Sequence, residues 1–196
     1  KSWMFDVVAN IECSAENLYQ FAIMGAIFAE ARLNLVYPRI GLLNIGIEEI
    51  KGHQSIRDAA NLLQKSTTLN YVGFIEGDVL LNGKADVIVS DGFAGNVALK
   101  TLEGTVRNLL SLLKDKANSR FIKTILAWFF RFVFKQRLKR INPDEYNGAS
   151  LIGLKAVVVK SHGSANVNAF AHAIADAAFQ ARQQLPEKIL AGLARY

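Results

Sequence analysis

Short apolar runs alternate along this chain with longer stretches whose apolar residues recur at helical spacing. Each run is a few residues long and rich in β-branched side chains, which is typical of a strand buried in a sheet. Strands that alternate with helices predict an α/β fold with a mainly parallel sheet covered by helices. The first predicted strand contains Trp3, Phe5, Val7 and Val8, and the others are Arg39–Ile45, Leu69–Ile75, Ala85–Ser90 and Ala156–Lys160.

Helices are expected between these strands. The first begins after Ser14, a favourable N-cap residue, and runs to about Leu33 before Pro38 breaks it. Loops are expected at Glu76–Gly83 and Asn142–Ser150. The other expected helices are Ile56–Gln64, Val97–Leu113, a basic helix within 114–140, one from about Ala165 to Gln184, and a short one after Pro186.

Three turns follow predicted strands directly, at Asn44–Gly52, Asp91–Asn96 and Ser161–Ser164. In open α/β sheets, ligands bind beyond the carboxyl ends of the strands. The three turns therefore predict a functional cleft.

The turn at Asn44–Gly52 contains an amide at Asn44 and a cation at Lys51. Lys51 lies between an apolar residue and glycine, where its ammonium group could reach an anion. The alternative is a solvated lysine in an ordinary turn, which is the commoner role of a lone lysine.

The turn at Asp91–Asn96 connects a strand to a helix and contains Gly92 and Gly95. Backbone N–H groups at a helix start suit an anion, and Asn96 and Lys100 could face the same ligand. Asp91 could act as a general base, a metal ligand or a helix cap. The alternative is an ordinary tight connection, and the glycine spacing matches neither a dinucleotide loop nor a Walker loop.

The turn at Ser161–Ser164 combines two hydroxyl groups, an imidazole and Gly163. Ser161, Ser164 and the backbone at Gly163 could hold phosphate oxygens. His162 could protonate a leaving group because imidazole titrates near neutral pH. The alternatives are a helix cap at Ser164 and a loop histidine, and no paired aspartate completes a Ser–His–Asp triad.

At 196 residues the chain is long enough for one substantial core, which favours a single domain over 1–196. The single cysteine, Cys13, excludes an internal disulfide and favours a reducing cytoplasm. Three scattered histidines predict no metal site, and no cofactor is expected. No uncharged apolar run approaches the roughly 20 residues of a membrane-spanning helix.

The net charge of +6 is concentrated in Lys114–Arg140, which holds nine Lys or Arg residues and one acid. The rest of the chain carries −2, which argues against a general basic face for nucleic acid. At 100° per residue, aromatic and basic side chains of this segment fall on opposite faces, typical of a helix lying in an anionic membrane surface. The predicted contacts are Phe121, Ile125, Trp128, Phe129 and Phe132, with Arg120, Lys123, Arg131 and Lys135. The alternatives are a core or dimer helix, and nucleic-acid binding is a weaker third.

Four stretches, in this order, resemble the bacterial phosphate acyltransferase of phospholipid synthesis, the PlsX family. They cover most of the chain, which resembles the carboxyl-terminal part of the usual family chain. They are NLYQFAIMGAIFAE (17–30), PRIGLLNIGIEEIKG (38–52), LNGKADVIVSDGFAGNVALKTLEG (81–104) and NGASLIGLKAVVVKSHGSANVNAFAHAI (147–174).

The resemblance implies a three-layer α/β/α fold like that of isocitrate dehydrogenase and phosphate acetyltransferase, with 114–140 as a protruding amphipathic insertion. It also implies transfer of a fatty acyl group from acyl carrier protein to inorganic phosphate, giving acyl phosphate. The implied setting is a cytoplasmic homodimer, peripherally bound to the inner face of the cell membrane, that supplies a membrane-bound glycerol-phosphate acyltransferase.

That chemistry, rather than the motifs, suggests catalytic roles for Lys51, Asp91 and His162. Lys51 and the second and third turns would hold phosphate, Asp91 would orient or deprotonate it, and His162 would assist the leaving thiolate. The rival functions are a short-chain phosphate acyltransferase acting on acetyl-coenzyme A and a non-catalytic membrane-docking module.

Overall fold

A computed structural model describes residues 2–115, 148–163 and 165–195 of the chain. Two compact units make up the chain, each described here by itself. The first comprises Lys1–Lys100, Ile152–Ala156 and Arg182–Tyr196, and the second comprises Thr101–Leu151 and Val157–Ala181. The single domain over 1–196 stays a prediction, and the basic insertion at 114–140 lies almost wholly outside the described residues.

The first unit is built on a four-stranded parallel sheet in the order β1-β4-β2-β3. The sheet and the helices against it confirm the predicted α/β class. Each strand is shorter than its predicted apolar run. The strands are β1 (Trp3–Phe5), β2 (Arg39–Leu43), β3 (Asn70–Ile75) and β4 (Val87–Val89).

Helix α1 (Ala15–Leu33) begins as predicted. The Asn17 N–H donates to the Ser14 hydroxyl at 3.2 Å, and the Ser14 N–H donates to the Asn17 side chain at 3.1 Å, which forms a capping box. The predicted end at about Leu33 is confirmed, and Asn34 rather than Pro38 ends the helix, in the left-handed conformation with φ of 54°. Asparagine tolerates this conformation better than most residues, so the helix closes before proline is reached.

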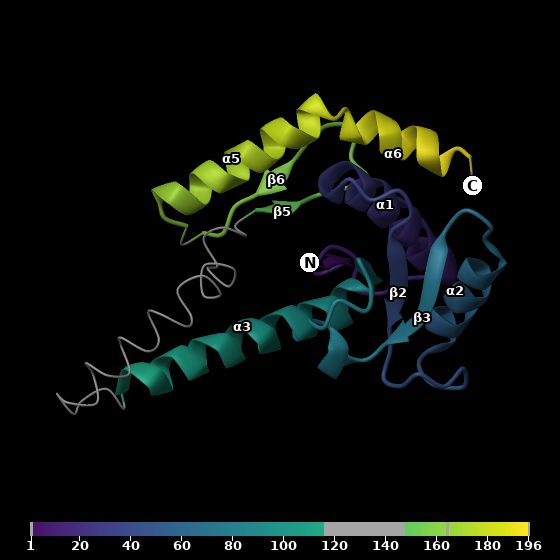
Figure 1. Ribbon diagram of the computed structural model, residues 1–196, viewed down its shortest axis with the longest axis horizontal. Helices are drawn as coiled ribbons and strands as arrows, with labels where there is room; N and C mark the ends of the chain where they lie inside the picture. The colour runs from purple at the N-terminus through teal and green to yellow at the C-terminus, as the bar shows by residue number, and fades with distance from the viewer. Residues whose placement is uncertain (1, 116–147, 164, 196) are drawn as a thin grey trace. The chain divides into compact units, whose positions relative to one another are not determined.

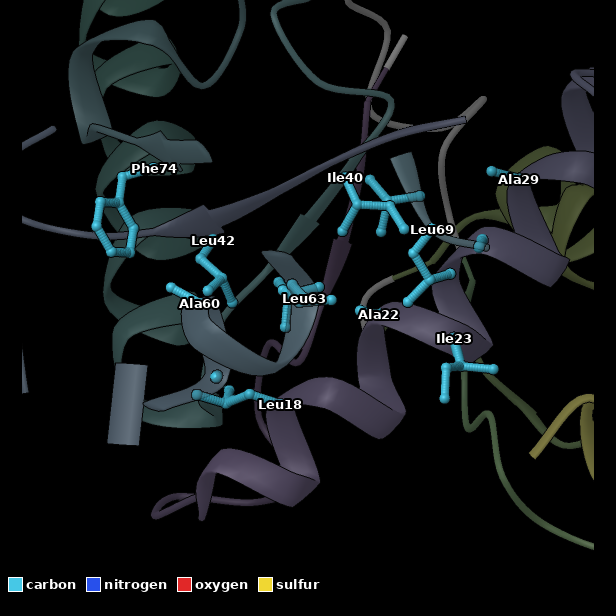
Figure 2. Close-up of a cluster of buried hydrophobic side chains, with 14 residues drawn as sticks. Leu18, Ala22, Ile23, Ala29, Ile40, Leu42, Ala60, Leu63, Leu69 and Phe74 are labelled. Atoms are coloured by element: carbon cyan, nitrogen blue, oxygen red, sulfur yellow. The ribbon is translucent and has the colours of Figure 1, made fainter. Parts of the chain in front are cut away.

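The main core lies between the sheet, α1 and α2 (Gln54–Lys65). Figure 1 shows these two helices beside β2 and β3, and Figure 2 shows the apolar side chains that they contribute. Gly25 brings α1 close to the sheet, since a Cβ atom there would lie 2.5 Å from Val87 Cγ1. Buried members include Leu18, Ala22, Ile40, Leu42, Leu63, Val87 and Val89.

Two smaller clusters complete the first unit. Helix α6 (Leu185–Leu193) packs Leu185 and Ile189 against Phe28 of α1. On the other face of the sheet, Ile88 packs with residues of the short helix η1 (Gly77–Val79) and its neighbours. Because Val87 and Val89 face the main core while Ile88 faces away, β4 is buried on both sides.

The second unit contains β5 (Ala149–Ser150), β6 (Val159–Lys160) and all of α5 (Val167–Arg182) except its last residue. The two strands pair antiparallel, so the loop predicted at Asn142–Ser150 is wrong in its last two residues. Gln180, buried to 2% exposure, donates to Ser150 Oγ at 2.5 Å and to Asp176 Oδ2 at 2.7 Å, which fastens α5 to β5.

Helix α5 begins at Val167 rather than at Ala165. The Ala169 N–H donates to Asn166 Oδ1 at 2.9 Å, so Asn166 caps the helix. Within the described ranges, no helix has the length and hydropathy needed to cross a membrane.

Candidate functional site

Polar residues follow the strands of the first unit at one edge of its sheet. Because the strands are parallel, Asp6 after β1, Asn44 after β2 and Ser90-Asp91 after β4 all lie at the carboxyl edge. Two of the three predicted turns therefore belong to neighbouring strands. The third, at 161–164, belongs to the second unit, and its convergence with the others stays a prediction.

Asn44 ties the loop after β2 into a fixed shape. The residue is only 6% exposed, and its Nδ2 group donates to the carbonyls of Gly46 and Lys51, each at 3.1 Å. Its buried Oδ1 lies against Gly52, whose φ of 86° and lack of a side chain allow this approach. Both amide hydrogens of Asn44 are therefore used inside the loop, and its contact with substrate stays a prediction.

Arg57 of α2 holds the same loop from outside. Its guanidinium group donates to the carbonyls of Gly52 at 2.5 Å and Ile50 at 3.3 Å. Lys51, in between, is exposed, and the stem of its side chain lies over Gly46. The loop thus presents the predicted catalytic lysine on a rigid support.

The loop also exposes three isoleucines around this lysine. Ile45, Ile47 and Ile50 are 80%, 63% and 82% exposed. Their apolar surface lies at the carboxyl edge, beside the polar groups of the site.

Helix α3 spans Gly92–Asp115, so the predicted turn at Asp91–Asn96 is wrong beyond its first residue. Asp91 caps the helix: its Oδ1 accepts the Ala94 N–H at 2.6 Å, and its carbonyl accepts the Gly95 N–H at 3.0 Å. The Gly92 N–H donates to the Asn10 carbonyl at 2.7 Å. Three amide hydrogens at the helix start therefore have partners within the protein, and anion binding by Gly92 and Gly95 stays a prediction.

The two glycines are explained by packing. A Cβ atom on Gly95 would lie 2.0 Å from the Asp6 carbonyl oxygen, and one on Gly92 would lie 2.8 Å from the Asn10 carbonyl oxygen. Glycine lets the helix start rest directly on the connection between β1 and α1. Further along α3, Asn96 is half-buried and Lys100 is exposed.

Asp6 is an organising residue that the sequence pattern did not reveal. Its Oδ1 accepts the N–H groups of Val8 and Ala9 at 2.8 and 3.0 Å. Its Oδ2 accepts the backbone and side-chain N–H groups of Asn10 at 2.7 and 2.9 Å. Burial raises the pKa of this carboxyl, but the four hydrogen bonds outweigh it and the pKa is lowered.

Two further residues connect Asp6 with the start of α3. The buried Ser90 donates its hydroxyl to the Asp6 carbonyl at 2.8 Å. Burial raises the pKa of the Cys13 thiol to about 11, and the charges of Asp91 and Asp6 add to this. The Cys13 thiol therefore stays protonated at neutral pH.

The turn at 161–164 is described as far as Gly163. The Ala165 N–H donates to the His162 carbonyl at 3.0 Å, which closes the turn. Ser161 is half-buried, and His162 and Gly163 are exposed. Ser164 and the nine predicted membrane contacts lie outside the described residues.

The described parts of the chain hold no group of three or more His, Cys, Asp or Glu side chains placed to bind a metal ion.

Comparison with known proteins finds a family model and relatives that match nearly the whole chain. The sequence model of a family described as fatty acid synthesis protein matches residues 1–188. A phosphate acyltransferase of Pasteurella multocida is 70% identical over 199 aligned residues, covering 100% of this chain and 59% of that protein. Those of Mannheimia succiniciproducens and Actinobacillus succinogenes are 66% and 62% identical, covering 97% and 98% of this chain and 57% of each relative. The chain thus spans less than two thirds of these relatives.

Proposed function

Since the chain belongs to the fatty acid synthesis protein family, we propose that the protein transfers a long-chain fatty acyl group from acyl carrier protein to inorganic phosphate. The observation that carries the proposal is the 70% identity, across the whole chain, to a protein named phosphate acyltransferase. The acyl carrier protein donor and the long chain follow from the family resemblance.

The reaction needs positioning more than covalent catalysis. A phosphate oxygen attacks the thioester carbonyl, the new C–O bond forms, and the C–S bond breaks as the thiolate leaves and takes a proton. The protein must hold a dianion against the carbonyl and stabilise the oxyanion that forms there. No covalent enzyme intermediate is required.

The geometry of the first unit supports roles for Lys51 and Asp91. The rigid loop carries Lys51 at the carboxyl edge, where its charge attracts phosphate, and Asp91 follows the end of the neighbouring strand β4. Asp91 caps α3 through Oδ1, and among the described residues Oδ2 has no hydrogen-bond partner, so we assign Oδ2 to orient phosphate or accept its proton. We assign the protonation of the thiolate to His162, and phosphate contacts to Asn96, Lys100, Ser161 and the adjoining turns.

The proposed setting is a cytoplasmic homodimer on the inner face of the cell membrane. The support is chemical: the product is an amphiphile, and 114–140 pairs aromatic with basic side chains. The proposed consumer of the acyl phosphate is a membrane-bound glycerol-phosphate acyltransferase.

The test is an assay of the full-length protein with palmitoyl-acyl carrier protein and phosphate, in which hydroxylamine traps acyl phosphate. We expect trapped product to depend on both substrates, and Lys51→Ala, Asp91→Ala and His162→Ala each to reduce it about 100-fold or more. Lys65→Ala, which removes an exposed lysine from the last turn of α2, is the matched control and should keep full activity. If all three site variants stay within a few-fold of the unmodified protein, the assigned roles are wrong.

Two further measurements separate the rival functions. Preference for acetyl-coenzyme A over palmitoyl-acyl carrier protein would favour the short-chain enzyme. Flotation with anionic liposomes tests the membrane contact, where Trp128→Glu and Phe132→Glu should weaken binding. Lipid binding without any acyl phosphate formation would favour the non-catalytic docking module.

A further inference from the structure

The connection between β1 and α1 is organised around one carboxylate. The Asp6 carboxylate accepts hydrogen bonds from the backbone N–H groups of residues 8–10 and from the side chain of Asn10. All four distances lie between 2.7 and 3.0 Å. Hydrogen bonds to a charged acceptor are about twice as strong as neutral ones, so this connection is held more firmly than an ordinary loop.

The start of α3 rests on this connection. The Gly92 N–H donates to the Asn10 carbonyl, and Asn10 is the residue that Asp6 binds through two hydrogen bonds. The Ser90 hydroxyl donates to the Asp6 carbonyl, and the Asp6 N–H donates to the Ser90 carbonyl at 2.7 Å. Asp91, between Ser90 and Gly92, is therefore fixed on both sides by groups that Asp6 holds in place.

Gly92 and Gly95 of α3 pack tightly against this connection. Gly95 lies so close to the Asp6 carbonyl that even a methyl group would collide with it. A shift of the connection would therefore be transmitted to the helix start rather than absorbed between them.

We infer that Asp6 is a positioning residue of the reaction centre: its carboxylate fixes the connection on which the first turn of α3 and Asp91 are placed. This inference rests on the proposed function for its catalytic part. Asp6 acts through Asp91 and is not assigned a contact with substrate. Misplacement of a reacting group by about 1 Å can cost on the order of 100-fold in rate, so loss of this carboxylate should lower turnover strongly.

The opposite edge of the same sheet provides a matched control. Asp86, at the amino end of β4, accepts from the Arg39 backbone N–H at 2.9 Å and from two guanidinium nitrogens at 3.0 and 2.9 Å. Hydrogen bonds lower the pKa of Asp86 as they do that of Asp6. The two carboxylates are thus comparable structural groups, and only Asp6 lies at the carboxyl edge.

The experiment compares Asp6→Asn with Asp86→Asn in the full-length protein, at a temperature where circular dichroism shows both folded. We expect Asp6→Asn to lower kcat for acyl phosphate formation about tenfold or more, with little change in the KM for palmitoyl-acyl carrier protein. Asp86→Asn should keep the kcat of the unmodified protein. Amide hydrogen exchange at Gly92 and Ala94 should speed up in Asp6→Asn alone. Equal kcat values in the two variants, or a loss of kcat without faster exchange, would overturn the inference.

A milder variant covers the case in which Asp6→Asn does not fold. Asn10→Ala removes one of the four donors and should lower kcat and protection in the same direction but less. Unchanged kcat and exchange in Asn10→Ala would then overturn the inference. If the unmodified protein forms no acyl phosphate, the proposed function fails, whereas the exchange measurement still tests the placement of α3 by Asp6.

Discussion

Two glycines in one helix should respond to the same substitution with opposite signs. Gly95 is the fourth residue of α3 and packs on the connection between β1 and α1. Around Gly104, no atom of another part of the described chain lies within 4 Å of an added Cβ. Gly95→Ala and Gly104→Ala therefore add the same methyl group to the same helix in different surroundings.

The magnitude at Gly95 follows from the contacts. The new Cβ would lie 2.0 Å from the Asp6 carbonyl oxygen and 2.8 Å from Ser90 Oγ, both closer than the 3.0 Å limit for such atoms. Overpacking of this kind costs about 1–3 kcal/mol, and contact with a backbone atom favours the upper end. Alanine regains about 1 kcal/mol of helix propensity, so the net loss of stability should be about 2 kcal/mol.

At Gly104 only the helix propensity changes, so Gly104→Ala should stabilise the protein by about 1 kcal/mol. Urea unfolding of the full-length protein, followed by circular dichroism, measures both effects as shifts of the midpoint at unchanged slope. If Gly95→Ala raises the midpoint as Gly104→Ala does, the close packing of α3 on Asp6 is refuted.

Three further predictions concern stability. Ser14→Ala removes the capping box of α1 and should cost about 1 kcal/mol in urea unfolding, whereas no loss would refute the cap. Gly52→Ala places a Cβ 2.1 Å from Asn44 Oδ1 at a φ of 86°, and should destabilise by about 1–3 kcal/mol. Hydrogen bonds from Arg39 lower the pKa of Asp86 in the folded protein. The carboxylate therefore stabilises the fold fully above its ordinary pKa of about 4, and this stabilisation is lost as the pH falls through the lower pKa of the folded protein. Acid unfolding of Asp86→Asn should therefore depend less steeply on pH below about 4.

The elements that could be predicted are those whose signals are local. Ser14 and the apolar spacing after it define α1 within one residue, and the β-branched run at Ala85–Ser90 marks β4. The polar residues after β2 and β4 could be placed at one edge because parallel strands share their direction.

The errors come from contacts between distant residues. Gly92 and Gly95 suggested a turn, but they are helical, and glycine is needed there because residues 6–10 press against the helix. Val7 and Val8 suggested a longer first strand, but the Asp6 carboxylate captures the N–H groups of residues 8–10 and ends it. Asn44 and Asp91 were identified by the rule that residues following parallel strands lie at one edge of the sheet. The same rule would have identified Asp6 if the first strand had been predicted to end at Phe5.

The order of the strands has a consequence for how the protein folds. Trp3 of β1 pairs with Val87 of β4, which lies 84 residues later in the chain. This pairing cannot form until β4 has been synthesised. At about 5–20 residues per second this interval lasts several seconds, during which β1 lacks its partner β4. The carboxyl edge, where Asp6, Asn44 and Asp91 meet, cannot exist before that moment. The carboxyl edge of this unit is thus assembled late, and a chaperone that shields β1 would act in that interval.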